Sequence, residues 1–559
     1  MTPGESRQYR RLIRHFAYRM VDNELIAADG EIHQTLTNIL GILGGLSFTT
    51  TVWLTLKYFF RVGEMPAAIQ QSVRWSDEEF QISLAMAVIG FFGVLAWDSL
   101  FPDRKDSLVL GPLPVRWQVM LRAKLTAIPL IMSLMLVVTV FFNGLVFPLL
   151  LGPGSFGQVL RFYGAYWFTM AAAGLFVFFL LFAIQGLLIL ALPYRWFLWI
   201  SAWIQMAGIF AVLLSFTLSP NVVWVAGGHQ RWALFLPSFW FLDLFQTLAG
   251  TPQPLAQSHS AFTFALPIVV VLGLVLYTAG YRRAVQKTVE ESEVTASKHR
   301  FGPGFLTRWI ASPRRRAVFQ FVARTMFRNR RHRLLLAVYA GLGLAFVSAG
   351  LGWMVRRGSA EFLHPTSTLL SVPLDLSFFL LVGVRALFTM PVELRSNWIF
   401  RFTEGGEPSD YLGGVRLFLW TIGLIPLSIA PLLVCGVLWG WTIALRHAFF
   451  LAWVILLFTE YLLWNFHKIP FTCSMLPGKA NLKVTVGVYL VIFLALSGLL
   501  TAIDMELLKA SAKGYFKFTA FATAVTLFVF YKRTRSERGW PFQFEERADW
   551  WLAKLELSR

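Results

Sequence analysis

Cysteine and charged residues are scarce in this chain of 559 residues. Its two cysteines, Cys435 and Cys473, are too few for a disulfide framework or a cysteine-built metal site. Charged residues make up 14% of the chain and hydrophobic residues 56%, a balance that excludes most soluble enzymes. A disordered chain is poor in aromatic residues, so the 53 Phe and 22 Trp exclude disorder as well.

Motifs of nucleotide and metal chemistry are also missing. The nearest fragment to a phosphate-binding Gly-x-x-x-x-Gly-Lys-(Ser/Thr) loop is residues 476–480, which lacks the upstream Gly and the hydroxyl residue for magnesium. The sequence contains no Gly-x-Ser-x-Gly elbow, dinucleotide fingerprint or His/Glu metal spacing. We therefore expect no catalytic site, cofactor or metal in this chain, and any nucleotide chemistry would come from a partner chain.

Long apolar stretches dominate the sequence instead. A helix needs roughly 20 apolar residues to cross about 30 Å of hydrocarbon, and about twelve stretches qualify. They run near 37–60, 80–100, 125–151, 164–192, 197–219, 261–280, 334–355, 366–390, 415–440, 447–466, 483–503 and 514–531. The sequence predicts an all-α polytopic membrane protein with about twelve transmembrane helices in two six-helix halves.

The basic residues predict the orientation. The net charge is +20, and about 38 of the 50 Lys and Arg lie in the segments that are inside if the N-terminus is cytoplasmic. We expect a multi-pass protein of the bacterial inner membrane with both termini in the cytoplasm. The basic excess then reflects topology and attraction to anionic membrane lipid, and we expect no nucleic-acid partner.

A basic segment near the middle, 281–333, separates two similar halves. Several residues recur at offsets of 305, 301 and 300: Phe16 and Arg19 with Phe321 and Arg324, Trp97 with Trp398, and Arg116 with Arg416. Because six spans is an even number, the repeats have parallel orientation. The predicted parts are an amphipathic segment 1–36, a first half 37–280, a linker and connecting helix 281–333, a second half 334–531 and a tail 532–559.

The loop after the second span carries the most informative motif. A polar stretch leads into a Leu-x-Leu-Gly-Pro-Leu-Pro turn at 108–114, and Lys124 follows. Here the chain resembles the membrane subunits of ATP-binding-cassette exporters of the type-two permease superfamily, whose first cytoplasmic loop often has a Leu-Pro-(Val/Ile)-(Ser/Arg) turn followed by Lys. The resemblance implies a coupling helix that docks into a groove on the ATPase. The implied coupling residues are Asp98, Asp103, Arg104, Asp106, Pro112, Leu113, Pro114 and Arg116.

Two further segments resemble the same family. The basic segment Arg10 to Arg19 is similar to its connecting helix, and the outer segment 220–260 is similar to one that re-enters the outer leaflet as short helices. That outer segment can also be read as a plain aromatic cap.

The chain departs from the family in two ways. Most members have one six-span half per chain, and the second-half loop of this chain lacks the Leu-Pro turn. That loop either docks differently or only seals the bundle, and its candidate residues are Glu393, Arg395, Trp398, Arg401 and Glu404.

Two charges, Arg385 and Glu460, lie within predicted spans, each near the cytoplasmic end. Burying either charge alone is costly, so they are candidates to pair at a shared depth, as in a proton relay. In the alternative interpretation, Arg385 reaches the headgroups and Glu460 bonds to a neighbouring helix.

The resemblance implies a permease subunit of an ATP-driven exporter, with ATP-Mg bound by separate ATPase subunits. An aromatic interior with few charges favours a hydrophobic or amphiphilic substrate over an ion. Two other functions stay open: an ion- or proton-coupled secondary transporter, and a non-transporting scaffold subunit of a membrane complex.

Overall fold

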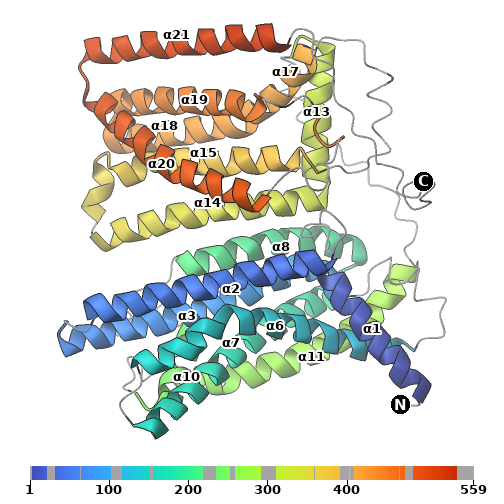
Figure 1. Cartoon of the computed structure of the whole chain (residues 1–559). Helices are drawn as coiled ribbons and strands as arrows, with labels where there is room; N and C mark the ends of the chain where they lie inside the picture. The colour runs from blue at the N-terminus through green and yellow to red at the C-terminus, as the bar shows by residue number, and fades with distance from the viewer. Residues whose placement is uncertain are drawn as a thin grey trace, which may run out of the picture. The chain divides into compact units, whose positions relative to one another are not determined.

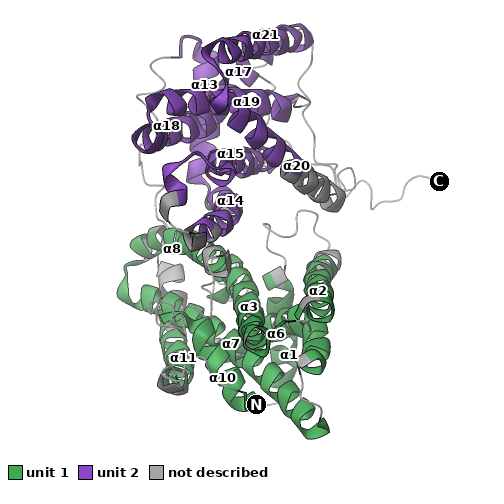
Figure 2. Cartoon of the chain, turned by 90° about the vertical axis from the view of Figure 1, so that its left-hand side faces the viewer, with its two compact units in different colours: residues 1–297 green, residues 298–559 purple. Residues whose placement is uncertain are grey.

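The chain is an all-α polytopic membrane protein (Figure 1). The computed structural model describes residues 3–21, 32–62, 65–101, 116–151, 155–217, 235–251, 259–290, 310–357, 359–390, 402, 408–464, 466, 468–472 and 482–537. Within these ranges every regular element is helical. The chain divides into two compact units, residues 1–297 and 298–559 (Figure 2), and this boundary falls inside the basic segment 281–333.

The described residues of unit 1 form one amphipathic helix, six long apolar helices and two shorter ones. In chain order they are α1 (Pro3–Val21), α2 (Ile32–Lys57) with the π-turn η1 (Tyr58–Val62), α3 (Ala67–Leu95), α4 (Trp97–Leu100), α6 (Trp117–Leu151), α7 (Phe156–Ala191), α8 (Tyr194–Thr217), α10 (Pro237–Ala249) and α11 (His259–Glu290).

Unit 2 repeats this order with a few differences. Its helices are α13 (Pro313–Arg328), α14 (Arg330–Arg357), the 3-10 helix η3 (Ser359–Leu363), α15 (Ser367–Leu387), α17 (Pro408–Leu419), the π-turn η5 (Trp420–Leu424), α18 (Ile425–Trp439), α19 (Trp441–Leu463), α20 (Leu482–Lys509) and α21 (Ala512–Glu537).

A helix lies at each of the twelve predicted stretches. In the described part of the chain, ten spans are long and apolar enough to cross a membrane by length and composition. Helices α8 and α20 cover the two remaining stretches, and α8 contributes a shorter apolar segment, Ile200–Leu213. One of the ten, Pro408–Trp439, runs from α17 through η5 into α18. The π-turn ends two residues before Pro426, which has no N–H to continue the regular hydrogen-bond pattern.

The second span begins earlier than the sequence predicts. We expected it near residue 80, but α3 begins at Ala67, directly after Pro66, whose fixed backbone angle suits a helix start. The added turns carry Asp77, Glu78 and Glu79, and all three are buried. The prediction failed because it searched for apolar runs, whereas these turns are buried through polar partners.

Aromatic packing holds α7 and α11 together in unit 1. The rings of Phe182 and Tyr277 stack with their centroids 4.4 Å apart. The helices approach closely at Gly186 and Gly273, where an added Cβ would lie 2.6 Å from the Leu276 carbonyl oxygen and 2.7 Å from that of Phe179. Small residues therefore set the distance between these two apolar helices.

Candidate functional site

The loop between α4 and α6, residues 102–115, begins from a buried root in unit 1. Trp97 and Leu100 are each only 1% exposed, and Phe101 is 5% exposed. Because these residues follow the end of α3, their backbone carbonyls have no partner further along a helix. Other helices of unit 1 supply the missing hydrogen bonds.

Helices α7 and α8 hold Trp97. Its indole Nε1 donates to Ser201 Oγ on α8 over 2.8 Å. The side chain of Gln185 on α7 donates to the Trp97 carbonyl oxygen over 2.9 Å. Both polar side chains are buried, so water competes little for these hydrogen bonds.

Helices α6 and α11 hold the last two residues before the loop. The Tyr277 hydroxyl on α11 donates to the Leu100 carbonyl over 2.6 Å. The ammonium of Lys124 on α6 donates to the Phe101 carbonyl over 3.0 Å. Lys124 is 2% exposed and also lies 4.9 Å from the centre of the Phe16 ring on α1. A buried ammonium needs such partners, and Lys124 thereby connects the loop root to α1.

Helix α1 packs against the other end of the same loop. Leu12 and Phe16 pack on Val119, Met120 and Ala123 of α6. Two polar contacts lie beside this cluster: Tyr9 OH is 2.6 Å from Thr126 Oγ1, and Arg116 is 3.2 Å from Glu5. Helix α1 therefore lies near both ends of loop 102–115: it contacts Lys124, which bonds to the residue before the loop, and Arg116, which follows the loop.

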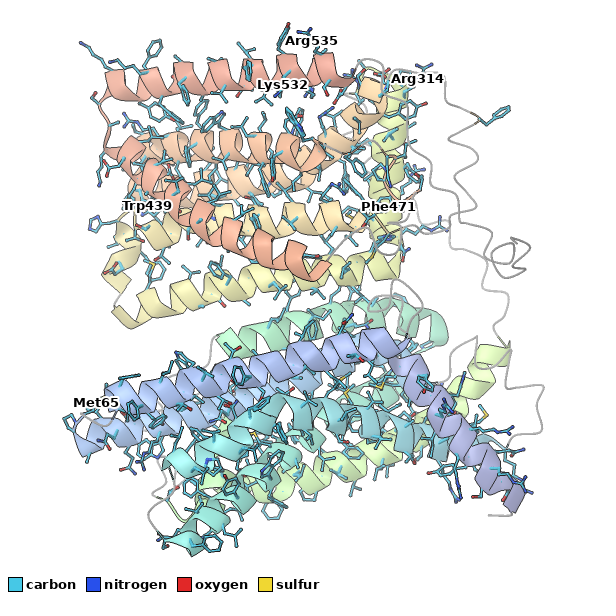
Figure 3. The ribbon with its side chains drawn as sticks, viewed as in Figure 1. Met65, Arg314, Trp439, Phe471, Lys532 and Arg535 are labelled. Atoms are coloured by element: carbon cyan, nitrogen blue, oxygen red, sulfur yellow. The ribbon has the colours of Figure 1, made fainter. Side chains whose placement is uncertain are left out.

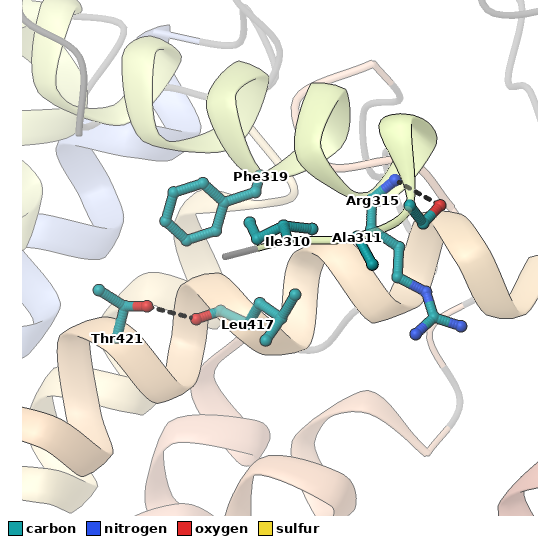
Figure 4. A pocket seen from close by; sticks show the side chains of 7 residues that line it. Ile310, Ala311, Arg315, Phe319, Leu417 and Thr421 are labelled. Carbon is teal, nitrogen blue, oxygen red and sulfur yellow. Dashed lines mark hydrogen bonds between the residues drawn. The ribbon is translucent and has the colours of Figure 1, made fainter. Parts of the chain in front are cut away.

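Unit 2 has a matching pair of helices, α13 and α17. Arg315 of α13 lies 2.9 Å from Asp410 of α17, so the charges are reversed relative to Glu5 and Arg116 in unit 1. The helices meet at Gly414, where an added Cβ would lie 2.7 Å from the Arg315 carbonyl oxygen. A cavity of about 350 Å³ opens beside this contact (Figure 4). Its lining is Ile310, Ala311, Ser312, Arg315, Phe319, Leu417 and Thr421.

The described residues contain only part of the predicted coupling loop. Asp98 lies in α4, and Arg116 lies at the start of α6. Asp103, Arg104, Asp106, Pro112, Leu113 and Pro114 lie outside the described residues, as do Glu393, Arg395, Trp398, Arg401 and Glu404 of the second-half loop. The structure thus describes the root of the first loop but not its tip.

The two predicted in-membrane charges have separate surroundings. Glu460 is 4% exposed, and its carboxylate lies 3.1 Å from Arg416 on α17 and 2.9 Å from Arg533 on α21. Glu537 also bonds to Arg416. Arg385 donates from Nε to the Leu462 carbonyl over 3.0 Å, and its guanidinium lies 4.3 Å from the Phe466 ring centre. The partners of Glu460 are thus two arginines on other helices, and neither is Arg385, with which the sequence offered a pair as one of two interpretations.

A buried polar cluster in unit 1 was missed by the sequence analysis. Lys57 pairs with Asp77 at 2.6 Å, Gln246 donates to Glu78 over 3.0 Å, and Tyr166 donates to Gln81 over 2.9 Å. These contacts join α2, α3, α7 and α10. The Asp-Glu-Glu-Phe-Gln sequence directly before the apolar run was the available signal, because nothing after Pro66 breaks the helix.

Unit 2 holds two further buried acids that sequence reasoning overlooked. His447 Nδ1 lies 2.6 Å from Asp504 Oδ2, and both side chains are 1% exposed. Ser497 donates to Asp375 over 2.6 Å. Asp375 falls inside the predicted span 366–390, so it could have been identified as an in-membrane charge.

The segment 220–260, which the sequence predicts to lie on the outer side, contains a packed helix, α10. Its Phe239, Phe241 and Phe245 are at most 2% exposed and belong to the core of unit 1, whereas a plain surface cap would leave such rings exposed. Gly250 ends the helix with a left-handed backbone, φ 73°, that glycine adopts without strain. Arg161 of α7 donates to the Leu248 carbonyl over 2.5 Å and so satisfies one of the last backbone acceptors.

Metal ligands do not cluster in the described ranges: no group of three or more His, Cys, Asp or Glu side chains there is arranged to hold an ion. Comparison with known proteins adds no family assignment. No protein-family model, no curated protein and no solved structure matches this chain.

Proposed function

We propose that this chain is the permease subunit of an ATP-driven exporter of the type-two ATP-binding-cassette class. In this proposal it moves a hydrophobic or amphiphilic substrate across the bacterial inner membrane, and separate ATPase subunits bind ATP-Mg. The observation that carries the proposal is the root of loop 102–115. Residues 97–101 form hydrogen bonds with side chains of α6, α7, α8 and α11.

Such a root suits the transmission of force from a partner. Several buried hydrogen bonds resist local movement of the loop root, because breaking one leaves an unsatisfied buried group at a cost of about 1–3 kcal/mol. A push on the loop would therefore move four helices together. The contact of α1 with both ends of the loop gives the partner a second surface to act through.

The apolar interior supports an amphiphilic rather than an ionic substrate. The buried core of unit 1 is rich in Phe, Leu and Ile. Its buried charges are occupied by protein partners, as in the pairs Lys57 with Asp77 and Gln246 with Glu78. An ion pathway needs charged or carbonyl groups directed at the ion, and these groups are already bonded to each other.

Copurification tests the partner directly. An ATPase encoded beside this chain should copurify with it from membranes. Replacing Leu113 and Pro114 by Ala should abolish the complex, whereas Trp398→Ala in the second-half loop should weaken it less, because that loop lacks the Leu-Pro turn. Sustained transport by the purified chain without ATP or a partner would overturn the proposal.

Lys124→Met tests coupling through the loop root. The change removes the ammonium that bonds to the Phe101 carbonyl but leaves the loop sequence intact. We expect the ATPase to remain bound while transport per ATP falls at least several-fold. Arg122→Met, two residues away on the exposed side of α6, is the matched control and should leave this ratio unchanged. Equal transport per ATP in the two variants would show that the hydrogen bond from Lys124 does not couple the loop to transport.

A proton-coupled carrier is the second candidate, and the buried pair His447 and Asp504 favours it. Buried ionisable residues within membrane helices often mark proton relays. This function predicts that an imposed pH gradient drives transport without ATP, and that Asp504→Asn abolishes that transport. Uptake measured in vesicles under either driving force distinguishes the two functions.

A further inference from the structure

Helix α21 packs on its unit differently from its counterpart α11. Each is the sixth predicted span of its half. In unit 1, α11 lies along α7 with glycines at the close contacts. In unit 2, only 6% of the most apolar stretch of α21 is buried, against 22% for α11. Most of the apolar surface of α21 is therefore not covered by other helices of unit 2.

Contacts near its two ends attach α21 to unit 2. Near its start, Tyr515 OH donates to the Arg446 carbonyl over 3.2 Å, and the rings of Phe518 and Trp453 lie 5.4 Å apart. Near its end, Arg533 pairs with Glu460 and Glu537 bonds to Arg416. Large apolar side chains between these contacts stay exposed, namely Phe521, Leu527, Phe528 and Tyr531.

Aromatic and basic side chains meet where α21 ends beside the end of α19. The Lys532 ammonium lies 4.8 Å from the ring centre of Trp464, so it spans the two helices. Trp464 is 46% exposed and Tyr461, one turn earlier on α19, is 60% exposed. Figure 3 shows Lys532 and Arg535 at the same end of unit 2 as Arg314 of α13. We call this place, formed by Tyr461, Trp464, Phe528 and Lys532, the α19–α21 seam.

The described side chains at and beside the seam carry positive charge. Arg416 and Arg533 are balanced by Glu460 and Glu537 in the neighbouring network. Among the residues that the structure describes, no carboxylate pairs with Lys532 or Arg535, and both side chains are exposed. Two cations therefore stand at the polar end of an apolar, aromatic surface.

We propose that the α19–α21 seam is a binding site for an anionic phospholipid of the leaflet at this end of α21. The headgroup phosphate contacts Lys532, with Arg535 adding to the local positive potential, and an acyl chain covers Phe528 and Tyr461. Exposed Trp and Tyr side chains favour headgroup depth, and cations there attract anionic lipid. A second copy of the chain fits less well, because a symmetric contact would place two positively charged surfaces against each other.

The proposal needs only that the chain lies in a membrane and does not depend on the transport function. The test uses the full-length protein in nanodiscs of phosphatidylcholine with increasing phosphatidylglycerol. Retained lipid is counted by native mass spectrometry after mild extraction. The test variant is Lys532→Gln with Arg535→Gln, and the matched control is Lys513→Gln with Lys517→Gln, which removes two exposed lysines from the other end of the same helix.

One basic residue near a membrane surface is worth about 1 kcal/mol toward anionic lipid, or roughly a five-fold change in affinity. We therefore expect the test variant to bind phosphatidylglycerol about 25-fold more weakly at this site than the wild type and the control. Phosphatidylcholine should not replace phosphatidylglycerol at the seam of the wild-type protein. Equal retention by test and control variants, equal binding of phosphatidylcholine, or a protein chain found on the seam would overturn the proposal. The thermal midpoints of both variants in lipid-free detergent verify that each is folded.

Discussion

The carboxylate of Glu460 accepts hydrogen bonds from arginines on two other helices. Arg416 approaches from α17 and Arg533 from α21, and Glu537 balances the second positive charge. An ion pair this deeply buried adds little net stability when intact, because both charges lose their water. Removing one member is much more costly, since it leaves an uncompensated charge in the interior.

Replacing Glu460 by Ala should therefore destabilise unit 2 by about 3–5 kcal/mol. Thermal unfolding of the detergent-solubilised protein measures the effect. Glu506→Ala is the matched control, because Glu506 is 75% exposed and its pair with Lys509 is worth at most about 1 kcal/mol. A shift for Glu460→Ala no larger than that of the control would show that the network contributes no stability.

At the scale of helices, the contact between α13 and α17 depends on the absence of a side chain. Ser312 precedes α13 and accepts a hydrogen bond from the Arg315 backbone N–H, and Pro313 follows as the first helical residue. In the first turn of this helix, the backbone carbonyl of Arg315 packs against Gly414 of α17. A methyl group at that position has no room unless the two helices move apart.

Gly414→Ala should lower the stability of unit 2 by about 1–3 kcal/mol, the usual cost of overpacking. Gly352→Ala is the matched control on α14, because an added Cβ there meets nothing within 4 Å. That change should be neutral or should raise stability by up to about 1 kcal/mol, since Ala favours a helix over Gly. Unfolding midpoints in the opposite order would show that α13 does not pack on α17 as described.

In unit 1, the ion pair between α1 and the start of α6 offers a test of how these two helices are aligned. Glu5 and Arg116 join α1 to α6. Glu5→Arg alone places like charges together, and adding Arg116→Glu restores an opposite pair. We expect a coupling energy of about 0.2–1 kcal/mol from the double-mutant cycle, because the pair is partly exposed. A coupling energy of zero in low salt would contradict the contact.

At the scale of the whole chain, the two units share an order of elements and differ in how the elements pack. Each begins with a helix that packs on the third apolar span, α1 on α6 and α13 on α17. In unit 1, α2 packs along α6, whereas in unit 2 α14 packs along α15. The two units therefore share the order of most of their elements but differ in which helices touch.

The positive-inside pattern predicts that both termini lie in the cytoplasm. In a chain with Cys435→Ala and Cys473→Ser, single cysteines would replace Gln8, Ser558 and Ser155. A membrane-impermeant maleimide should label only position 155 in intact cells, because Ser155 lies between α6 and α7 in a predicted outer loop. Permeabilised cells should show labelling at all three positions. Labelling at position 8 or 558 in intact cells would reverse the topology.

The sequence by itself determined the class of protein and the approximate position of each long helix, except for the start of α3. Hydrophobic length is enough for this, because any stretch of about 20 apolar residues must be a helix in hydrocarbon. It also directed attention to loop 102–115 and to Lys124, which the structure buries at the loop root. The sequence also contains enough information to identify Asp375 as a charge within a span, since it lies inside the predicted span 366–390.

Only the tertiary structure decided which polar groups share a partner. Asp77 and Glu78 are buried because the preceding helix α2 brings Lys57 to Asp77, and α10, which is distant in sequence, brings Gln246 to Glu78. Glu460 meets Arg416 and Arg533 because α17, α19 and α21 converge at their ends. Hydropathy measures what one segment loses by leaving water, whereas the burial of a charge depends on a second segment that supplies the opposite charge or hydrogen bond.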